Sequence, residues 1–247
     1  MKKNSVFLAL LLTTLLAGGA RADFNFDDKM QELMTDVMSN PSAFLSEFQQ
    51  DMEATTPLAP GKTVALQTGL FPTTIPFTFT NISGKYMLHP EGNWSPGMPQ
   101  IDLIGGYWGM AWSGLLANQN RYINDVSLSG YYAGLLATSS ISPRLRVFGG
   151  LKRSRVHSSM TLQQPITVYN VPVNNFDSTF MDDFVIAGVE QEITLDKWWS
   201  MQVDYGTGSK NPAAKVSWYG KNFEVGLNIY PEGVITFQPV WNFHVEF

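Results

Sequence analysis

The sequence predicts an all-β protein, an antiparallel transmembrane β-barrel of about ten strands, with a short α-helical segment before the first strand. Three observations favour this fold class. Apolar and polar residues alternate with a period of two through most of residues 62–247, the pattern of strands with two different faces. Aromatic residues gather on the apolar face near strand ends, while full charges recur on the polar face. The first residues also have the features of an export signal.

Residues 1–22 are predicted to be a secretory signal peptide. Two lysines precede an apolar run over residues 6–17, and the segment closes on an A-x-A cleavage pattern at residues 20–22. The apolar run is too short to span a membrane as a helix. We therefore expect an exported chain that begins near Asp23 after cleavage.

Composition excludes several classes of function. The chain has no cysteine and a formal net charge of −5. The predicted signal contains three basic residues and no acidic residue, so its removal changes the net charge to −8. No basic surface of the kind that nucleic-acid binding needs is visible. Three scattered histidines and no cysteine give no metal-ligand spacing. We predict no metal, no cofactor and no nucleic-acid partner.

Residues 23–61 are predicted to be an acidic amphipathic helical segment followed by a linker. Residues 23–53 carry eight acidic residues and one basic residue. An apolar stripe at helical spacing is formed by Phe26, Met30, Leu33, Met34, Val37 and Met38. Pro41 suits the first turn of a second helix. This segment either enters the barrel lumen, lies beneath the barrel or pairs with another protein, and we favour docking on or in the barrel.

Residues 62–247 are predicted to form the barrel. The alternation gives strands at 62–69, 77–87, 101–116, 126–138, 144–156, 183–195, 197–206, 213–219, 222–230 and 234–247. Residues 117–125, 157–182 and 206–212 are then outer loops, and the second is the longest. Residues 88–100 are long for a periplasmic turn and "YPEG" is short for an outer loop, so eight or twelve strands stay open.

Two strands alternate imperfectly. The pattern of 126–138 places Tyr131 and Leu135 on the nominally inner side, and strand 183–195 is also irregular.

In hydrocarbon an unpaired backbone N–H or C=O costs several kcal/mol, so a spanning sheet has no open edge. The last strand is therefore expected to pair with the first.

The chain ends in "WNFHVEF", where apolar residues occupy every second position up to Phe247. This ending resembles the carboxyl-terminal signature of Gram-negative outer-membrane β-barrel proteins. The resemblance covers the signal, the final strand and the general pattern of 62–247, and it does not single out one family within the class. It implies an outer-membrane location, contact with outer-membrane lipid and lipopolysaccharide, and recognition of the last strand by the barrel-assembly machinery.

Two sets of residues follow from the predicted faces. A charge network in the lumen is expected from Arg144, Arg146, Lys152, Glu190, Glu192, Asp204, Lys215 and Glu224. An aromatic girdle at the membrane interface is expected from Trp108, Trp112, Trp199, Trp218, Trp241 and Phe247. Inward charges in a narrow barrel pair across the lumen, since an unpaired buried charge is costly; the alternative is an anion-selective constriction. Arg153 and Arg155 lie on the outer face, where they either meet lipopolysaccharide phosphates or are solvated.

His157 and Ser159 share one strand face and resemble the H-x-S pair of outer-membrane lipases and lipid-A deacylases. A serine nucleophile needs a base within hydrogen-bond reach and a group that orients the base. Asn170 and Asn174 are candidates for that role, but both lie in the predicted loop without a fixed geometry. We favour a solvated base here over a catalytic one, and the sequence leaves open whether the chain is an enzyme.

The leading functional hypothesis is a small pore or transport barrel for small solutes. The alternative is a non-conducting structural or surface-interaction barrel whose segment 157–182 meets partners. An outer-leaflet lipid-modifying hydrolase is the third hypothesis.

Overall fold

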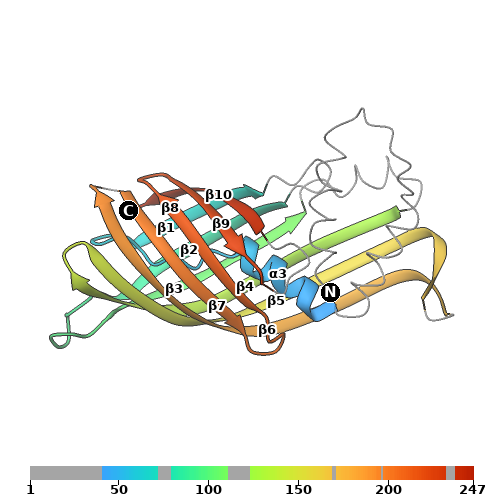
Figure 1. Ribbon diagram of the computed structural model, residues 1–247, viewed down its shortest axis with the longest axis horizontal. Coiled ribbons are helices and arrows are strands. Elements are labelled where there is room, and N and C mark those ends of the chain that lie inside the picture. Colours follow the sequence, from blue (N-terminus) through green and yellow to red (C-terminus); the bar gives the residue numbers. More distant parts are fainter. Residues whose placement is uncertain (1–40, 72–78, 111–122, 169–170, 196, 232–236) are drawn as a thin grey trace.

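The computed structural model describes residues 41–71, 79–110, 123–168, 171–195, 197–231 and 237–247. These ranges hold one helix and ten strands (Figure 1). The elements are α3 (Pro41–Met52), β1 (Val64–Phe71), β2 (Phe79–His89), β3 (Gln100–Met110), β4 (Ile123–Ser142), β5 (Leu145–Val168), β6 (Val171–Thr194), β7 (Lys197–Gly206), β8 (Pro212–Tyr219), β9 (Phe223–Ile229) and β10 (Phe237–Glu246).

The ten strands form one closed antiparallel barrel in which each strand pairs with its neighbours in sequence and β1 pairs with β10. The closing ladder runs from Ala65 opposite Glu246 to Gly69 opposite Asn242. Beyond its end, the backbone N–H of Phe247 donates to the carbonyl of Val64 at 2.8 Å. The predicted closed barrel of about ten strands, sealed by its last strand, is confirmed.

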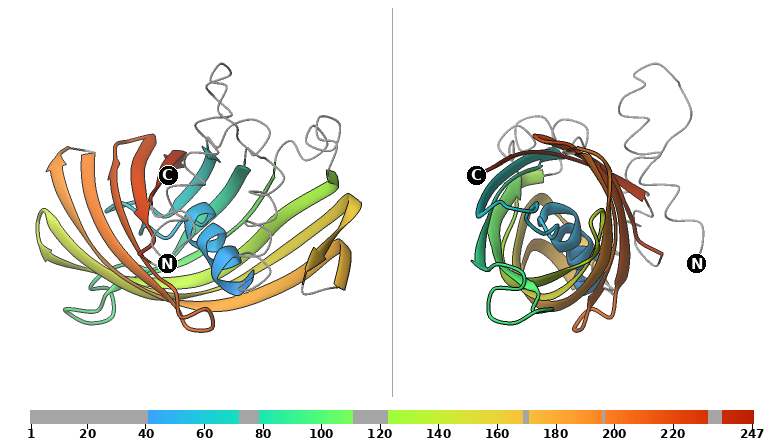
Figure 2. Two further views of the ribbon diagram at one scale, coloured as in Figure 1. Left: turned by 45° about the vertical axis from the view of Figure 1, so that its right-hand side comes forward. Right: turned by 90° about the vertical axis from the view of Figure 1, so that its left-hand side faces the viewer.

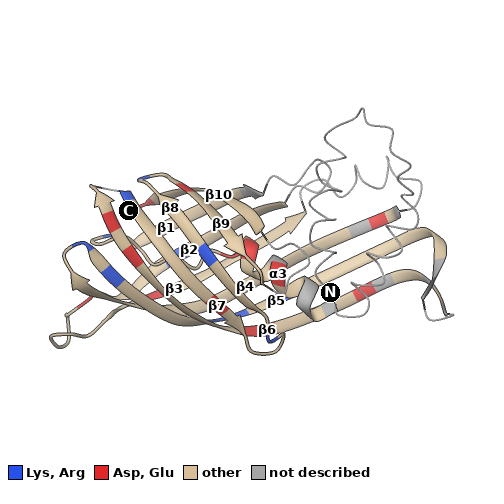
Figure 3. Ribbon diagram, in the orientation of Figure 1, with Lys and Arg blue, Asp and Glu red and all other residues tan. Residues whose placement is uncertain are grey.

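The barrel reverses the usual distribution of side chains. Along β7, Ser200, Gln202 and Asp204 are buried, while Met201 and Val203 between them are 45% and 56% exposed. The same order holds on the last strand, where the buried residues include Gln238, Asn242 and His244 and the exposed ones include Phe237, Trp241, Phe243 and Val245. Charged residues are sparse along the strands (Figure 3). All ten strands carry exposed large apolar side chains, whereas water-soluble monomers rarely expose contiguous apolar patches larger than roughly a few hundred Å².

Strands β4, β5 and β6 extend well past the others at the end of the barrel opposite the C-terminus (Figures 1 and 2). They have 20, 24 and 24 residues, whereas the remaining strands have 7 to 11. The prediction of a loop at 157–182 is therefore wrong: the β5–β6 ladder runs without interruption from Leu145 to Thr161 and resumes at Ile166. Beyond Leu151 the outer face of β5 is polar. The alternation of apolar and polar residues that marks the first part of the strand therefore disappears, although the backbone stays extended.

Tyr131 and Leu135 face outward, 52% and 48% exposed. The expectation that they lie on the inner side is wrong, because the inner positions of β4 hold Tyr132 and Leu136, which are equally apolar. The inner wall here is not polar. It contains an apolar cluster made of Ile104, Tyr132, Leu136, Phe148 and Ile186, so hydropathy alone does not separate the two faces.

The helix α3 lies inside the ring of strands, as the view along the barrel shows (Figure 2, right). It begins at Pro41, as the sequence predicts for the second helix, and its 12 residues end at Met52. Residues 23–40 of the predicted acidic segment lie outside the described ranges. Within those ranges, no helix has the length and apolar character required to cross a bilayer.

Candidate functional site: the plugged lumen

The lumen is occupied by the chain's own segment 41–58, which we call the plug. It consists of α3 and the extended residues that follow it, and every residue from 49 to 58 is buried. Met52 and Leu58 are both 0% exposed. A helix with its side chains is about 10–12 Å wide, and a barrel of ten strands is slightly wider than the eight-stranded kind that side chains alone can fill. One helix therefore suits this lumen.

Apolar contacts hold the helical part of the plug. Leu45 and Met52 belong to one buried cluster with wall residues from five strands. The wall members of the cluster are Phe79, Trp108, Leu128, Val156 and Val240. Complete burial of a leucine or methionine side chain is worth about 1.5–3 kcal/mol, so these contacts fix the depth of the helix.

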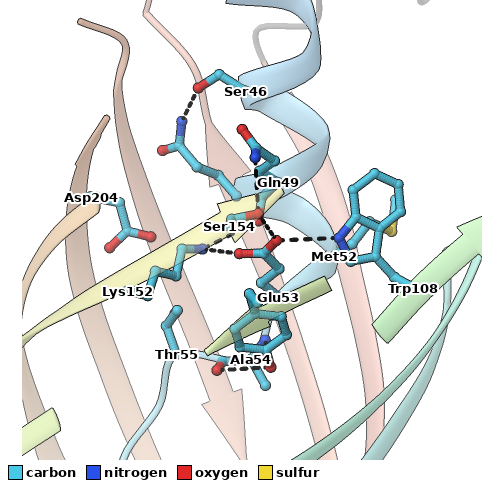
Figure 4. Close-up of polar contacts among 12 residues, drawn as sticks. Ser46, Gln49, Met52, Glu53, Ala54, Thr55, Trp108, Lys152, Ser154 and Asp204 are labelled. Atoms are coloured by element: carbon cyan, nitrogen blue, oxygen red, sulfur yellow. Dashed lines mark hydrogen bonds and ion pairs between the residues drawn. The ribbon is translucent and has the colours of Figure 1, made fainter. Parts of the chain in front are cut away.

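A buried ion pair follows directly after the helix. The Nζ of Lys152 lies 2.8 Å from Oε2 of Glu53, and both side chains are 0% exposed. The other oxygen of Glu53 accepts hydrogen bonds from the indole N–H of Trp108, at 3.3 Å, and from the Ser154 hydroxyl (Figure 4). The plug is thus joined to β3 and β5 through one carboxylate.

The extended part of the plug is recognised through its backbone. The N–H of Ala54 donates to the Tyr132 hydroxyl at 2.9 Å, and that hydroxyl donates to the Ala54 carbonyl. The N–H of Leu58 donates to Asp102 at 3.1 Å, and its carbonyl accepts from Arg146 at 2.9 Å. Wall side chains thus satisfy backbone groups that have no ladder partner, which makes their burial affordable.

Side chains of the plug add further contacts with the wall. Lys85 donates to the Thr56 hydroxyl at 2.7 Å, and Gln202 donates to Thr55 at 2.5 Å. Asp51 accepts from Asn228 at 2.6 Å and from the Tyr230 hydroxyl. Asp51 is part of α3, inside the lumen. Burial raises the pKa of its carboxyl to about 7, against the lowering effect of these two hydrogen bonds.

Most residues of the predicted charge network face the lumen. Two pairs lie within the wall itself, Arg146 with Glu190 at 2.5 Å and Lys215 with Glu224 at 2.8 Å. The buried members of the predicted set are Arg146, Lys152, Glu190, Asp204, Lys215 and Glu224. The wall pairs cross neighbouring strands, whereas Lys152 pairs with the plug.

Two other predicted members lie at the end of the barrel that carries the C-terminus. Glu192 is half-buried, and its backbone N–H donates to the Arg144 carbonyl at 2.8 Å. The placement of Arg144 in the lumen is wrong. It is exposed in the turn between β4 and β5, because the alternation of β5 begins only at Leu145 and does not extend back through the turn.

The predicted girdle is divided between the two faces. Trp218 and Trp241 are 39% and 42% exposed on the outer wall, Phe247 is 65% exposed, and Trp199 is half-buried on the outer face. Trp112 lies outside the described residues.

Trp108 was expected on the outside, and this prediction is wrong. It is 0% exposed and faces the plug. It pairs across the ladder with Gly130, where a Cβ would lie 2.5 Å from the indole ring. The missing side chain of Gly130 is what leaves room for the ring.

The two catalytic candidates lie on the outer face of β5. His157 is exposed, and its Nδ1 is 3.2 Å from the Thr179 hydroxyl and 3.9 Å from Asp177. Ser159 pairs with Asp177 in the ladder. In the described part of the chain no hydrogen bond joins His157 to Ser159, and no group of three or more potential ligands has the geometry of a metal site.

Sequence reasoning missed the neutral half of the site. Tyr132, Ser154 and Gln202 hold the plug, but single hydroxyl and amide side chains on a polar strand face carry no distinctive spacing. One signal was available for Trp108, since a glycine in a strand interior often marks a position that a large neighbour covers.

No protein-family model matches the chain, and no curated protein sequence matches it. Among solved structures, the chain is similar to the crystal structure of Ail, the attachment invasion locus protein of Yersinia pestis. The match has 8% sequence identity and a TM-score of 0.33, and it covers 73% of this chain and 95% of Ail. The fold of this chain is defined by its own closed ladder of ten antiparallel strands.

Proposed function

We propose that this chain is an outer-membrane β-barrel that its own plug closes, and that it opens as a pore for small polar solutes when the plug leaves. The outer wall supports the membrane location, since side chains such as Leu151 and Phe243, 64% and 56% exposed, are stable in contact with acyl chains. In this setting the short turns and the C-terminus lie on the periplasmic side, and the extended β4–β6 sheet lies outside the cell.

The observation that carries the proposal is how the plug is attached. It contributes no strand to the barrel, whose ladder is complete without it. Among the described residues, its attachments to the wall include hydrogen bonds, the ion pair between Lys152 and Glu53, and the apolar cluster that contains Leu45 and Met52 of α3. Departure of the plug would leave the sheet intact and expose a wall that includes Gln67, Ser83, Ser200, Gln202 and Ser217, which water can wet.

The plug also limits the size of the passage. The space that α3 would leave is about as wide as a helix with its side chains, about 10–12 Å. Such an opening admits small solutes and excludes folded proteins.

The test is the conductance of the purified full chain in planar bilayers. We expect the wild type to be mostly closed and Lys152→Gln, which removes the partner of Glu53, to open far more often. Arg153→Gln is the matched control, because Arg153 is next in sequence but exposed on the outer face, where it pairs with Asp183. If Lys152→Gln releases the plug by an independent assay and still carries no current, the pore proposal is wrong.

A second candidate is a non-conducting barrel whose extended sheet binds other surfaces. It is favoured by the length of β4, β5 and β6, whose outer face past Leu151 holds polar residues such as Arg155, His157 and Asp177. Bacteria that carry a β5–β6 hairpin shortened at 157–182 should then adhere less to surfaces that the wild type binds, with unchanged barrel folding.

Two partners are also proposed. Lipopolysaccharide phosphates would approach Arg155, whose guanidinium lies over the Tyr131 ring, 5.9 Å from its centre. Arg155 lies where the apolar outer wall of β5 ends. The barrel-assembly machinery would read the last strand, whose outward residues end at Phe247. Truncation of Phe247 should lower the amount of assembled barrel without changing export.

A further inference from the structure

The carboxylate of Glu53 is held as a ligand would be. The Lys152 ammonium lies 2.8 Å from one oxygen, and the Trp108 indole N–H and the Ser154 hydroxyl donate to the other. All these side chains are buried. Figure 4 shows them converging on Glu53 from the wall.

The donors and the acceptor belong to different parts of the molecule. Lys152 and Ser154 are two residues apart on the inner face of β5, and Trp108 is on β3, so all three belong to the barrel wall. Glu53 belongs to the plug. The wall therefore keeps a complete set of carboxylate donors whichever group occupies it.

The surroundings hold the Lys152 ammonium in place. Its Nζ lies 4.7 Å from the centre of the Phe184 ring and 5.8 Å from that of Tyr132, within the range of attraction between a cation and an aromatic face. Asp204 on β7 also interacts electrostatically with Lys152, and its two oxygens accept hydrogen bonds from Gln202 at 2.8 and 2.9 Å. Among the described residues, the carboxylate that forms an ion pair with the Lys152 ammonium is Glu53 of the plug.

We propose that Lys152, Ser154 and Trp108 form a binding site for carboxylate solutes, and that Glu53 is a tethered carboxylate that occupies it while the barrel is closed. The inference rests on the proposed pore function and names its substrate class. One ammonium and two neutral donors match the single charge and two oxygens of a carboxylate. A phosphate dianion would lack a second cation here, and the site has no arginine fork for bidentate phosphate binding.

Occupancy by Glu53 and by a solute must be competitive. A short flexible tether alone would give Glu53 an effective concentration in the millimolar range. The apolar cluster and the backbone hydrogen bonds of the plug raise that concentration, so a free carboxylate competes with Glu53 only above the millimolar range. Because binding free energies are reciprocal, a solute that takes the site also weakens docking of the plug.

The test is chemical rescue of the full-length variant Glu53→Ala in detergent micelles. Sodium acetate is added, with acetamide, sodium chloride and inorganic phosphate as matched solutes, and the thermal unfolding midpoint of the barrel is followed by gel mobility. We expect acetate to raise the midpoint of Glu53→Ala and to leave the wild type unchanged. The double variant Glu53→Ala/Lys152→Gln should require about tenfold more acetate, the loss of one charge-assisted hydrogen bond.

Every outcome bears on the site itself. An equal response of Glu53→Ala and the double variant, or no response of Glu53→Ala, would overturn the proposal, and a larger shift with phosphate than with acetate would contradict the ligand class. If Glu53→Ala folds poorly, refolding yield becomes the readout, and rescue by acetate but not acetamide is expected. None of these readouts needs current, so a silent barrel with acetate rescue would refute the pore and keep the site.

Discussion

The ion pair between Lys152 and Glu53 gives the sharpest prediction about the plug. Replacing Lys152 with glutamine leaves the Glu53 carboxylate buried without a counter-charge, since both side chains are 0% exposed. Removal of one partner of a buried pair costs about 3–5 kcal/mol. We take the lower end, because the Ser154 hydroxyl and the Trp108 indole still donate to Glu53. About 3 kcal/mol corresponds to a plug that leaves its site about a hundredfold more often.

The assay uses the absence of cysteine in the chain. Ala54 is 2% exposed in the plug, so Ala54→Cys introduces a single thiol that a maleimide reaches only when the plug is out. When docking is fast relative to the reaction, the labelling rate reports the fraction of undocked plug. Lys152→Gln in this background should label about a hundredfold faster, and Arg153→Gln should label like its parent.

The double variant completes the cycle. Glu53→Gln alone leaves the Lys152 ammonium without its partner, whereas Glu53→Gln/Lys152→Gln removes both charges. The double variant should therefore label more slowly than either single variant. Labelling of Lys152→Gln at the parental rate, or additive effects in the cycle, would refute the role of the ion pair in holding the plug.

Three further predictions concern other contacts. The pKa of Asp51 is raised to about 7 in the docked plug, so the docked form binds the proton more tightly and docking strengthens as the pH falls from about 7 toward the ordinary aspartate pKa near 4. For each unit by which the pH falls, the labelling rate relative to that of Asp51→Asn at the same pH should fall by up to about tenfold. A ratio of the two rates that does not change with pH would contradict this. Leu45→Ala should speed labelling through loss of about 2–3 kcal/mol of packing in the apolar cluster, whereas an unchanged rate would show that α3 does not depend on that cluster. Gly150→Ala should prevent heat-modifiable barrel formation, since its Cβ would lie 2.2 Å from the Leu135 carbonyl, while Gly84→Ala, whose nearest neighbour is at 4.0 Å, should fold normally.

The sequence was sufficient for the barrel because lipid imposes a strong rule. A wall between acyl chains and an enclosed lumen must alternate, and β7 and β10 do so with few exceptions. Closure by the last strand follows from backbone hydrogen bonding alone. These constraints act locally along each strand, so a single sequence displays them.

Other features depend on contacts that local patterns do not contain. The extension of β5 past Leu151 leaves the apolar wall, and its polar residues look like those of a loop. The inward turn of Trp108 depends on Gly130, which is on another strand. The position of the plug depends on a match between a helix and the lumen. The eight acidic residues of 23–53 do not by themselves show that Glu53 is the one that meets Lys152.

The extended residues after α3 lie inside the barrel, and the proposed closure of the lumen depends on this position. Hydrogen exchange of the peptide covering 49–58, followed by mass spectrometry in native-like membranes, tests it most directly. Residues 53–58 have no ladder, yet the N–H groups of Ala54 and Leu58 are bonded to Tyr132 and Asp102 and buried. A plugged lumen predicts protection of this peptide comparable to that of the strands, and its loss in Lys152→Gln while the strands stay protected. Exchange of the wild-type peptide within seconds, as in an unstructured linker, would contradict the account.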